Sequence, residues 1–365
     1  MNARLRLTIR DLRVRAANVP MTLPLQTSSG TISIAPLALI DLHTEEGVTG
    51  SAYLFCYTPL VLKPVVQLIA NLAPVIKGDL VAPLDIERKL QSRFRLLGAK
   101  GVAGMALAGI DMAAWDALAK AQGMPLVRAL GGEARRIPAY NSCGLGMIGA
   151  ERAAEEAQRL AAPGFSAIKV RLGYPDLVTD IAVVRAVKRA IGDDILLMAD
   201  YNQALSVAEA ARRIQALDGE GLYWIEEPIL ADDYAGYAHL RSKAGTPIQM
   251  GENWWGPHEM AKCLATGATD YGMPDAMKIG GVTGWQQAAA IAEVAGLPVS
   301  SHLFPEVSAH LLAASPTCHW LEYVDWAAPI LQQPLKLEGG YAIAPDVAGS
   351  GIAWDEAGVE RCLVP

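Results

Sequence analysis

The sequence has few cysteines and no long apolar run, and these absences exclude several classes of protein. Its five cysteines are scattered and no two form a CxxC pair, so we expect reduced thiols rather than a disulfide framework. Apolar runs break off well before the roughly 18 residues that a membrane span requires. Residues 1–15 are charged throughout and lack the apolar stretch of a signal peptide. We therefore expect a cytoplasmic protein with no membrane partner.

A surplus of basic residues is also lacking, because the formal net charge is −7 at pH 7. A nucleic-acid-binding protein needs a basic face, so we expect no nucleic-acid partner. Hydrophobic residues make up 52% of the chain and charged residues 19%, which is enough apolar material for a large core. With 365 residues the chain is too long for one ordinary core, and two domains are expected.

The first domain, residues 1–131, is expected to have an α+β fold. Apolar and polar residues alternate at 4–17 and 31–44, which predicts two strands, and 45–50 predicts the turn to a third. A helical pattern follows at 60–122. Strands followed by helices, rather than alternating with them, are typical of an α+β domain.

From residue 132 to 330, short apolar strands alternate with amphipathic helices. The predicted strands lie at 137–143, 166–172, 195–202, 222–227, 248–252, 271–278, 298–303 and 319–324. Eight such units in about 190 residues fit a (β/α)₈ barrel of the TIM type. The Pro- and Gly-rich tail, 331–365, is expected to return to the N-terminal domain and complete it.

Polar side chains stand at or just beyond the ends of these predicted strands, about one βα unit apart. They are Lys169, Arg171, Asp200, Asn202, Glu226, Glu252, Asp275, His302 and Glu322. The strand ends of a (β/α)₈ barrel converge on one face, where active sites are built. We therefore expect these side chains to meet around one point.

Three consecutive units supply the carboxylates of Asp200, Glu226 and Glu252. Brought together, these groups would repel one another unless a cation neutralised them, and oxygen-only ligands suit the hard cation Mg²⁺. Taken alone, each has a simpler interpretation: an Asp at a strand end is most often a helix N-cap, and Glu226-Glu227 could be an exposed loop pair. Their shared register favours a Mg²⁺ site.

The remaining polar residues indicate acid–base chemistry. A lone strand His is usually structural, but Asp275 could bond one ring nitrogen of His302, orient the ring and raise its basicity. The pKa of Glu322 is expected to rise among carboxylates and apolar neighbours, so that a neutral acid could donate to an anionic intermediate. The alternative for Glu322 is an interior glutamate paired with Lys or Arg. With Mg²⁺ and Lys169, this set predicts removal of a proton α to a carboxylate through an enediolate.

The motifs DYNQ, WIEEP, QMGENW and MPDAMKIGGVTGW resemble the mandelate racemase/muconate lactonizing enzyme family of the enolase superfamily. The similarity runs essentially from end to end. It implies Mg²⁺ on Asp200, Glu226 and Glu252, a capping domain over the barrel, and assembly as a homo-oligomer such as an octamer. The roles that the resemblance implies are a His302–Asp275 dyad as base, Glu322 as electrophile, Lys169 and Ser142 at the substrate carboxylate, and Asn202 near the α-hydroxyl.

The chain departs from the family pattern at two places. Where the family has Lys-x-Lys, with the second Lys as the base on the opposite face, this chain has Arg171, whose guanidinium stays charged. The other place is the specificity loop, 23–36, which is expected to cap the site. Leu25 and Ile32 keep its apolar character and Tyr57 is retained, but Ser29 is polar, so the substrate could be more polar than an aryl acid.

Three functions remain open from the sequence. The leading prediction is an isomerase that racemises a 2-hydroxycarboxylate of the mandelate type. The second is a hydro-lyase, a dehydratase of a polyhydroxylated acid that needs only His302, although an apolar cap argues against sugar acids. The third is a non-catalytic relative that binds a small carboxylate.

Overall fold

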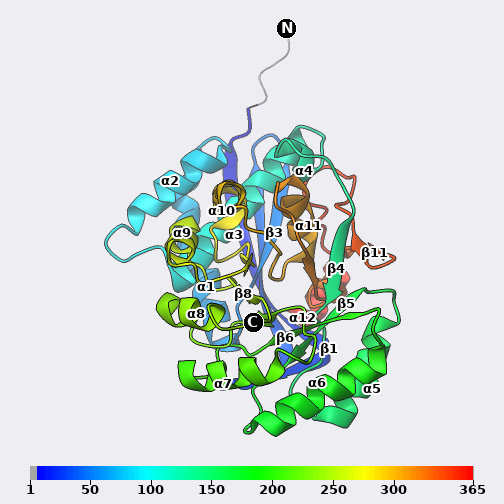
Figure 1. The fold of residues 1–365 in the computed structure, drawn as a ribbon. Coiled ribbons are helices and arrows are strands. Elements are labelled where there is room, and N and C mark those ends of the chain that lie inside the picture. The colour runs from blue at the N-terminus through cyan, green and yellow to red at the C-terminus, as the bar shows by residue number, and fades with distance from the viewer. Residues whose placement is uncertain (1–5, 365) are drawn as a thin grey trace.

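The N-terminal domain pairs a three-stranded antiparallel sheet with three long helices. A computed structural model describes residues 6–364 of the chain. The sheet contains β1 (Ile9–Thr27), β2 (Gly30–Thr44) and β3 (Thr49–Phe55), and the helices are α1 (Pro59–Ile76), α2 (Pro83–Arg93) and α3 (Gly101–Ala121). In Figure 1 this domain is blue and cyan. Helix α3 packs closely on β3 because Gly50 has no side chain, and a Cβ there would collide with Ala113 and Ala117.

The predicted specificity loop, 23–36, is instead the end of a long β-hairpin. Residues of β1 and β2 pair through Leu25–Ile32, Gln26–Thr31 and Thr27–Gly30, which leaves only a two-residue turn. Gly30 has a φ of 130°, which suits the close turn. Prolines 20 and 24 lack an amide hydrogen, and the register shifts between Pro20 and Leu25. The loop was expected from the resemblance to the family, and the structure shows that most of this segment is paired strand.

The second domain is the (β/α)₈ barrel. Its strands are β4 (Ile137–Asn141), β5 (Ala167–Arg171), β6 (Leu196–Asp200), β7 (Ile225–Glu226), β8 (Ile248–Met250), β9 (Tyr271–Gly272) and β10 (Leu321–Tyr323). Its helices are α5 (Ala150–Ala161), α6 (Leu177–Ile191), α7 (Val207–Leu217), α8 (Tyr234–Arg241), α9 (Pro257–Thr266), α10 (Gly281–Ala295) and α11 (Pro305–Ala314), while α4 (Leu126–Ala129) precedes β4. Neighbouring strands are parallel, and β10 pairs with β4.

Three predicted strands are much shorter than expected. Only Ile225 and Glu226 of 222–227 and only Tyr271 and Gly272 of 271–278 are in a strand, and 298–303 contributes parallel bridges at Val299 and His302 rather than a strand. Pro274 lies within 271–278 and Pro298 begins 298–303, and proline cannot donate to the ladder. The residues after β9 turn instead around Asp275, whose carboxylate accepts the amides of Met277 and Lys278.

The C-terminal tail contacts both domains. The short strands β11 (Leu337–Glu338) and β12 (Tyr341–Ala342) join the edge of β4, so the first part of the tail belongs to the barrel sheet rather than to the N-terminal domain. Beyond them the chain reaches the N-terminal domain: Ser350 donates to Asp116, and Trp354 donates to Asp41. After the 3₁₀ turn Ala328–Ile330 and α12 (Glu356–Cys362), Leu363 pairs with Ala17.

Two helices, α1 and α3, have the length and apolar composition that a membrane span would need. Helix α3 has this composition because it is a core helix, and most of its residues are buried. Helix α1 buries one face, contains Pro64 and Pro74, and is more exposed.

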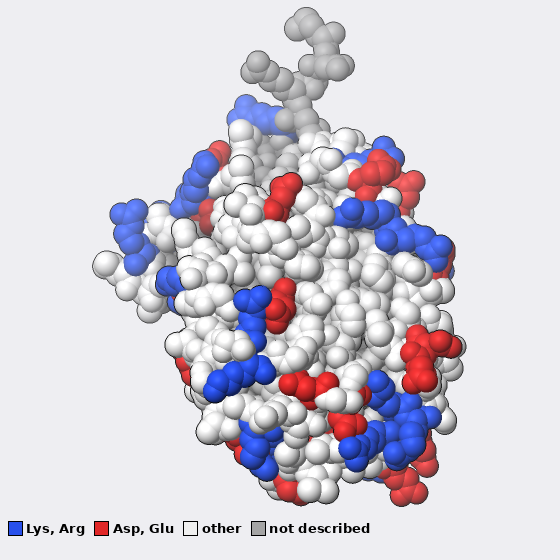
Figure 2. Space-filling model, viewed as in Figure 1, with Lys and Arg blue, Asp and Glu red and all other residues white. Residues whose placement is uncertain are grey.

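Acidic and basic side chains are interspersed on the face of the molecule shown in Figure 2, and this face carries no extended basic patch.

Candidate active site

The polar residues predicted from the sequence meet beyond the carboxyl ends of the barrel strands. Backbone strain collects at the same end: seven described residues other than glycine have a positive φ, and each follows a strand or strand-like segment. They are Tyr57, Leu145, Asn202, Gln203, Glu227, Leu303 and Phe304. Such conformations are costly and gather at functional sites. The strain therefore indicates the same end of the barrel as the polar residues do.

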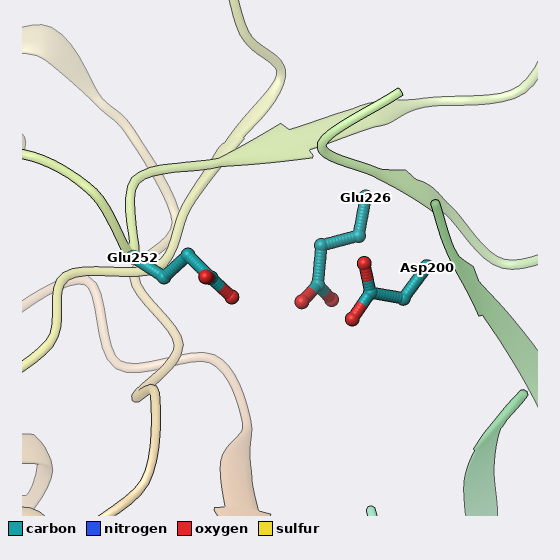
Figure 3. Close-up of side chains that lie close together, drawn as sticks. All are labelled: Asp200, Glu226 and Glu252. Atoms are coloured by element: carbon teal, nitrogen blue, oxygen red, sulfur yellow. The ribbon is translucent and has the colours of Figure 1, made fainter. Parts of the chain in front are cut away.

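Asp200, Glu226 and Glu252 form a carboxylate cluster. Asp200 ends β6, Glu226 ends β7, and Glu252 follows β8 by two residues. All three are buried, and ligand atoms from the three residues lie within 4.8 Å of one another. Figure 3 shows the three side chains turned toward the same space. Oxygen ligands brought this close match what a divalent cation of the Mg²⁺ type requires.

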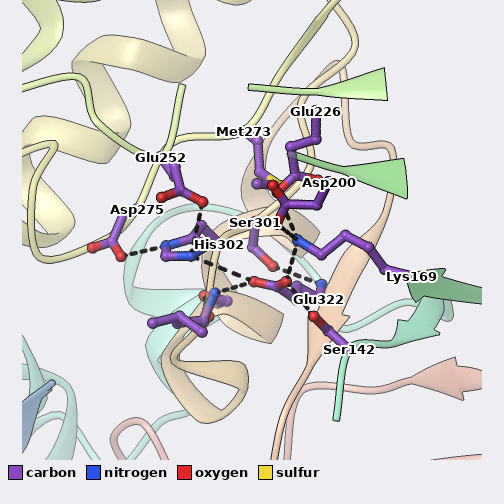
Figure 4. Close-up of polar contacts among 12 residues, drawn as sticks. Ser142, Lys169, Asp200, Glu226, Glu252, Met273, Asp275, Ser301, His302 and Glu322 are labelled. Carbon is purple, nitrogen blue, oxygen red and sulfur yellow. Dashed lines mark hydrogen bonds and ion pairs between the residues drawn. The ribbon is translucent and has the colours of Figure 1, made fainter. Parts of the chain in front are cut away.

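Lys169 supplies positive charge at the edge of this cluster. Its Nζ lies 2.6 Å from Glu226 Oε1, 2.8 Å from Glu322 Oε1 and 3.4 Å from Asp200 Oδ2 (Figure 4). Burial favours the neutral amine and lowers the pKa of Lys169, but the carboxylates, Glu226 foremost, outweigh it, and the net pKa lies above the ordinary value. These carboxylates therefore favour the charged form of Lys169.

His302 and Asp275 form the predicted dyad. Nδ1 of His302 lies 2.6 Å from Asp275 Oδ2, and Nε2 faces the carboxylate cluster, 3.2 Å from Glu252 Oε2. Burial lowers the pKa of His302, but Glu252, Glu322 and Asp275 raise it to a net value of about 9. The ring is thus held by one nitrogen and presents the other to the site, as a general acid or base requires.

Glu322 does not have the raised pKa expected from the sequence. Burial raises its pKa, but the charges of Lys169 and His302 and the hydrogen bond from Ser142 lower the pKa by more than burial raises it. The net pKa therefore lies below the ordinary value. The alternative interpretation, an interior glutamate paired with a lysine, describes this arrangement. The strand pattern placed Glu322 among carboxylates, but it carried no sign that Lys169 would lie 2.8 Å away.

Arg171 is buried but is not directed at the carboxylate cluster. Nη1 donates to the carbonyl oxygens of Ser142 and Gly144, each at 3.0 Å, and Nη2 donates to Ser142 Oγ at 2.7 Å. Ser142 Oγ in turn donates to Glu322 Oε1 at 2.7 Å. Nη1 also lies 3.5 Å from Lys169 O, so every acceptor of this guanidinium is a neutral oxygen atom.

The other predicted substrate contacts divide into two groups. Asn202 Nδ2 donates to Asp200 Oδ2, and its own Oδ1 is buried with no protein partner, so this amide belongs to the site. The Tyr57 hydroxyl is likewise buried without a partner, and its ring lies 4.4 Å from Lys278 Nζ. In the hairpin, Leu25 is buried and Ile32 partly buried, whereas Ser29 is exposed at the turn.

Three residues next to the cluster were missed. Asn253 donates to Glu227 Oε2 and Glu252 Oε1, and it accepts a bond of 2.7 Å from Lys278 Nζ. Burial and the charge of Glu252 raise the pKa of Glu227 to about 8. The signal was present in the sequence, because these residues flank the ligands in IEEP, GENW and PDAMK.

Comparison with known families agrees with this architecture. Residues 9–131 match the N-terminal domain model of mandelate racemase/muconate lactonizing enzymes, and residues 152–358 match the enolase C-terminal domain-like model. The chain belongs to this family. Family membership accounts for a capping domain joined to a (β/α)₈ barrel, and for carboxylate ligands at the ends of consecutive barrel strands.

Members of the family with known structures are similar over the whole chain. An enolase from Bradyrhizobium, solved with magnesium and mandelic acid, is 44% identical, has a TM-score of 0.95, and is covered over 100% of both chains. An enolase from the alpha proteobacterium bal199, solved with magnesium, is 44% identical with a TM-score of 0.96, and the match covers 98% of this chain and 100% of the other. These structures and the carboxylate cluster identify Mg²⁺ as the cofactor.

A characterised relative performs a different reaction from racemisation. The L-talarate/galactarate dehydratase of Salmonella typhimurium is 32% identical over 279 residues, which cover 75% of this chain and 70% of the relative. The family thus includes dehydratases among its members. Which reaction this chain performs depends on its own residues.

Proposed function

We propose that this enzyme removes the α-proton of a 2-hydroxycarboxylate with His302 as its single base and expels a β-hydroxyl group as water. The observation that carries the proposal is the contrast between two positions. The His302 ring is held by Asp275 and presents Nε2 to the site. Arg171, at the position of a second base, is a cation bound to carbonyl oxygens. Racemisation by two bases needs a proton carrier on each face, whereas dehydration needs only one.

The chain's residues divide the work as follows. Nε2 of His302 takes the α-proton, and Asp275 keeps the ring oriented by accepting from Nδ1. The electrons of the broken C–H bond form a carbon–carbon double bond as the bond from the β-carbon to its hydroxyl breaks. His302 returns the proton to the leaving hydroxyl, which departs as water, and the enol product becomes a 2-keto acid. Asp200, Glu226 and Glu252 would hold Mg²⁺, which would supply positive charge to the substrate carboxylate.

Racemisation of a mandelate-type acid is the second candidate. The 44% identical Bradyrhizobium structure holds mandelic acid, which has no β-hydroxyl group to lose. The buried Leu25 and partly buried Ile32 in the hairpin are compatible with an aryl substituent. Two observations support dehydration. Arg171 is bonded to Ser142, and a relative of the chain is a dehydratase.

Proton exchange in D₂O separates the two candidates. Both enantiomers of mandelate and lactate, and a panel of 2,3-dihydroxycarboxylates, would be incubated with the enzyme and Mg²⁺ and followed by NMR. Dehydration predicts a 2-keto acid from one or more dihydroxy acids, and α-deuteration of one mandelate enantiomer without inversion. Equal inversion of both mandelate enantiomers would instead establish racemisation. Absence of exchange and of elimination with every acid would overturn both.

A further inference from the structure

Arg171 makes an unusual set of contacts for a buried arginine. Its side chain is almost inaccessible, yet it forms no ion pair with a carboxylate within the described residues. All its acceptors are neutral: the carbonyl oxygens of Ser142, Gly144 and Lys169 and the hydroxyl oxygen of Ser142. Burying a guanidinium without a paired anion is costly, so Arg171 is expected to lower the stability of the fold.

The guanidinium determines the direction of the Ser142 hydroxyl. Arginine has only donors, so Ser142 Oγ must accept the 2.7 Å bond from Nη2 with a lone pair. A serine hydroxyl carries one proton, and that proton is therefore directed to the other neighbour, Glu322 Oε1, at 2.7 Å. The chain of donors runs in one direction, from Arg171 through Ser142 to Glu322.

Glu322 occupies a position where small displacements matter. Its Oε2 accepts from the amide of Leu303 at 2.9 Å and lies 3.9 Å from His302 Nε2. Its Oε1 lies 2.8 Å from Lys169 Nζ. The carboxyl group thus spans the space between the proposed base and the fixed cation, and Ser142 supplies one of the bonds that hold it there (Figure 4).

Arg171 also holds the loop that follows β4. Besides the bonds to Ser142 and Gly144, its own amide donates to Leu145 O at 2.9 Å. Gly144 and Leu145 both have positive φ, 58° and 46°, so this turn needs support from its surroundings. Two residues further on, Met147 donates to Gln26 in the hairpin of the cap.

We propose that Arg171 is a positioning residue for Glu322. Its bond to Ser142 Oγ directs the hydroxyl proton of Ser142 toward the Glu322 carboxyl group, and this bond holds the carboxyl group in place in the site. The inference rests on the proposed function for its kinetic consequence, but not for its structural one. We call the chain of donors from Arg171 through Ser142 to Glu322 the relay, and neither Arg171 nor Ser142 transfers a proton in the reaction. Arg171 acts on Glu322 only through Ser142.

The kinetic test is a cycle of Arg171→Met, Ser142→Ala and the double variant. Rates of α-proton exchange would be measured on the hydroxy acid that the wild type exchanges fastest. Each single substitution is expected to lower kcat by about 10- to 100-fold with KM and Mg²⁺ affinity little changed, because the Glu322 carboxyl group lies beside Nε2 of His302, the proposed base. The double variant should be no worse than the poorer single variant, since both break the same relay. Multiplied effects would overturn the inference.

Two further variants separate positioning from folding. Arg135 also donates to two backbone carbonyls, those of Leu312 and Ser315, but lies outside the site, so Arg135→Met is a matched control that should leave kcat unchanged. Arg171→Lys keeps the charge and serves if Arg171→Met does not fold. A lysine cannot reproduce the planar fork that meets both the carbonyls and Oγ, so kcat for the enantiomer whose α-proton faces His302 should fall as well, and this enantiomer alone is assayed because lysine is the family's base on the opposite face. Wild-type kcat in Arg171→Lys would count against the relay.

A structural test is independent of the reaction. Crystal structures of the wild type and of Arg171→Met would be compared at the Ser142–Glu322 contact. The inference predicts that Ser142 Oγ turns away and the Glu322 carboxyl shifts in the variant. An unchanged contact would overturn it. If the wild type exchanges no α-proton from any hydroxy acid, the proposed function fails while this comparison still decides the role of Arg171.

Discussion

Glu252 connects the metal ligands to the proposed base, because its carboxylate belongs to the cluster and also lies 3.2 Å from His302 Nε2. Glu252→Gln removes one negative charge and one strong oxygen ligand. We expect Mg²⁺ affinity to fall by at least about 10- to 100-fold, with a comparable or larger loss of turnover. Calorimetric titration with Mg²⁺ and exchange assays with and without EDTA would measure both. The control is Glu259→Gln, an outer glutamate bound to Lys100, and full activity in EDTA would disprove the metal assignment.

His302 is the residue on which the chemistry depends. His302→Asn keeps a polar group of similar size but removes the proton carrier, so exchange should fall by at least about 10²- to 10⁴-fold. Asp275→Asn should have a similar effect, because the amide can no longer accept from Nδ1 and orient the ring. His319→Asn tests a histidine that bonds Tyr223 and Ser300, outside the site, and should exchange normally. Wild-type exchange in His302→Asn would exclude it as the base.

For single residues, the sequence predicted which side chains lie near the site, but it did not predict their protonation states or hydrogen-bond partners. The register of Asp200, Glu226 and Glu252 on consecutive strands predicted a cluster, because strand ends converge whatever the side chains do. The protonation state of Glu322 depends on how far Lys169 reaches from a neighbouring strand. Likewise Arg171 was expected to enter the site beside Lys169, but its long side chain turns to the carbonyls of the β4 loop. Distances of this kind are absent from a sequence pattern.

The hairpin of β1 and β2 is the element through which the cap reaches the barrel. Gln26 lies against Gly146, where an added Cβ would sit 2.6 Å from Gln26 N and 2.7 Å from Gln26 O. Backbone cannot move aside as a side chain can, so Gly146→Ala should displace the hairpin. A shift of about 1 Å can reduce a rate by about a hundredfold, and we expect kcat/KM to fall at least about tenfold with Mg²⁺ affinity retained. Steady-state kinetics and Mg²⁺ titration would measure this.

Two controls fit the same experiment. Gly219→Ala adds a Cβ where no atom lies within 4 Å, so it should leave kcat/KM unchanged. Ser29→Val alters the exposed turn of the hairpin and should also leave it unchanged, because the Ser29 side chain is exposed to solvent. If Gly146→Ala behaves like these controls, the hairpin does not govern substrate binding.

Element boundaries show which signals a sequence carries. Helices α1 to α3 lie where the helical pattern predicted them, because apolar residues recur on one face. The end of the hairpin was expected to be a loop because the resemblance implied one, although residues 25–27 and 30–32 pair as strands. The segment 298–303 packs as a barrel strand would, yet it pairs only at single residues. Apolar runs indicate burial and do not reveal how many backbone bonds form.

At the scale of the whole molecule, the two domains meet through buried polar contacts rather than through a linker. Asp111 on α3 accepts from the amide and the hydroxyl of Thr283 at the start of α10, and Trp115 donates to the same hydroxyl at 2.9 Å. Tyr53 of β3 donates to Glu306 of α11 at 2.7 Å. Two domains and a returning tail were predictable from length and composition. The residues that join them were not, because each contact links positions more than a hundred residues apart.

This joint predicts how stability depends on pH. Burial raises the pKa of Asp111 from its ordinary value to about 7, although the hydrogen bonds from Thr283 oppose the rise. Between the unfolded pKa near 4 and the folded pKa near 7, the folded protein holds a proton that the unfolded chain has released. The contribution of Asp111 to the free energy of unfolding therefore falls as pH rises through this window, by up to about 1.4 kcal/mol per pH unit, and is constant above it.

Asp111→Asn removes this titration while keeping an acceptor for the amide of Thr283. The difference in free energy of unfolding between wild type and variant should therefore shift against the wild type from pH 5 to pH 7 and level off by pH 8. Urea unfolding followed by circular dichroism at each pH would measure it. Asp176→Asn is the matched control, because Asp176 caps α6 at the surface and its pKa is lowered by bonds from Thr179. Parallel pH profiles of wild type and Asp111→Asn would show that Asp111 stays ionised throughout, and that burial at this joint is offset by the start of α10.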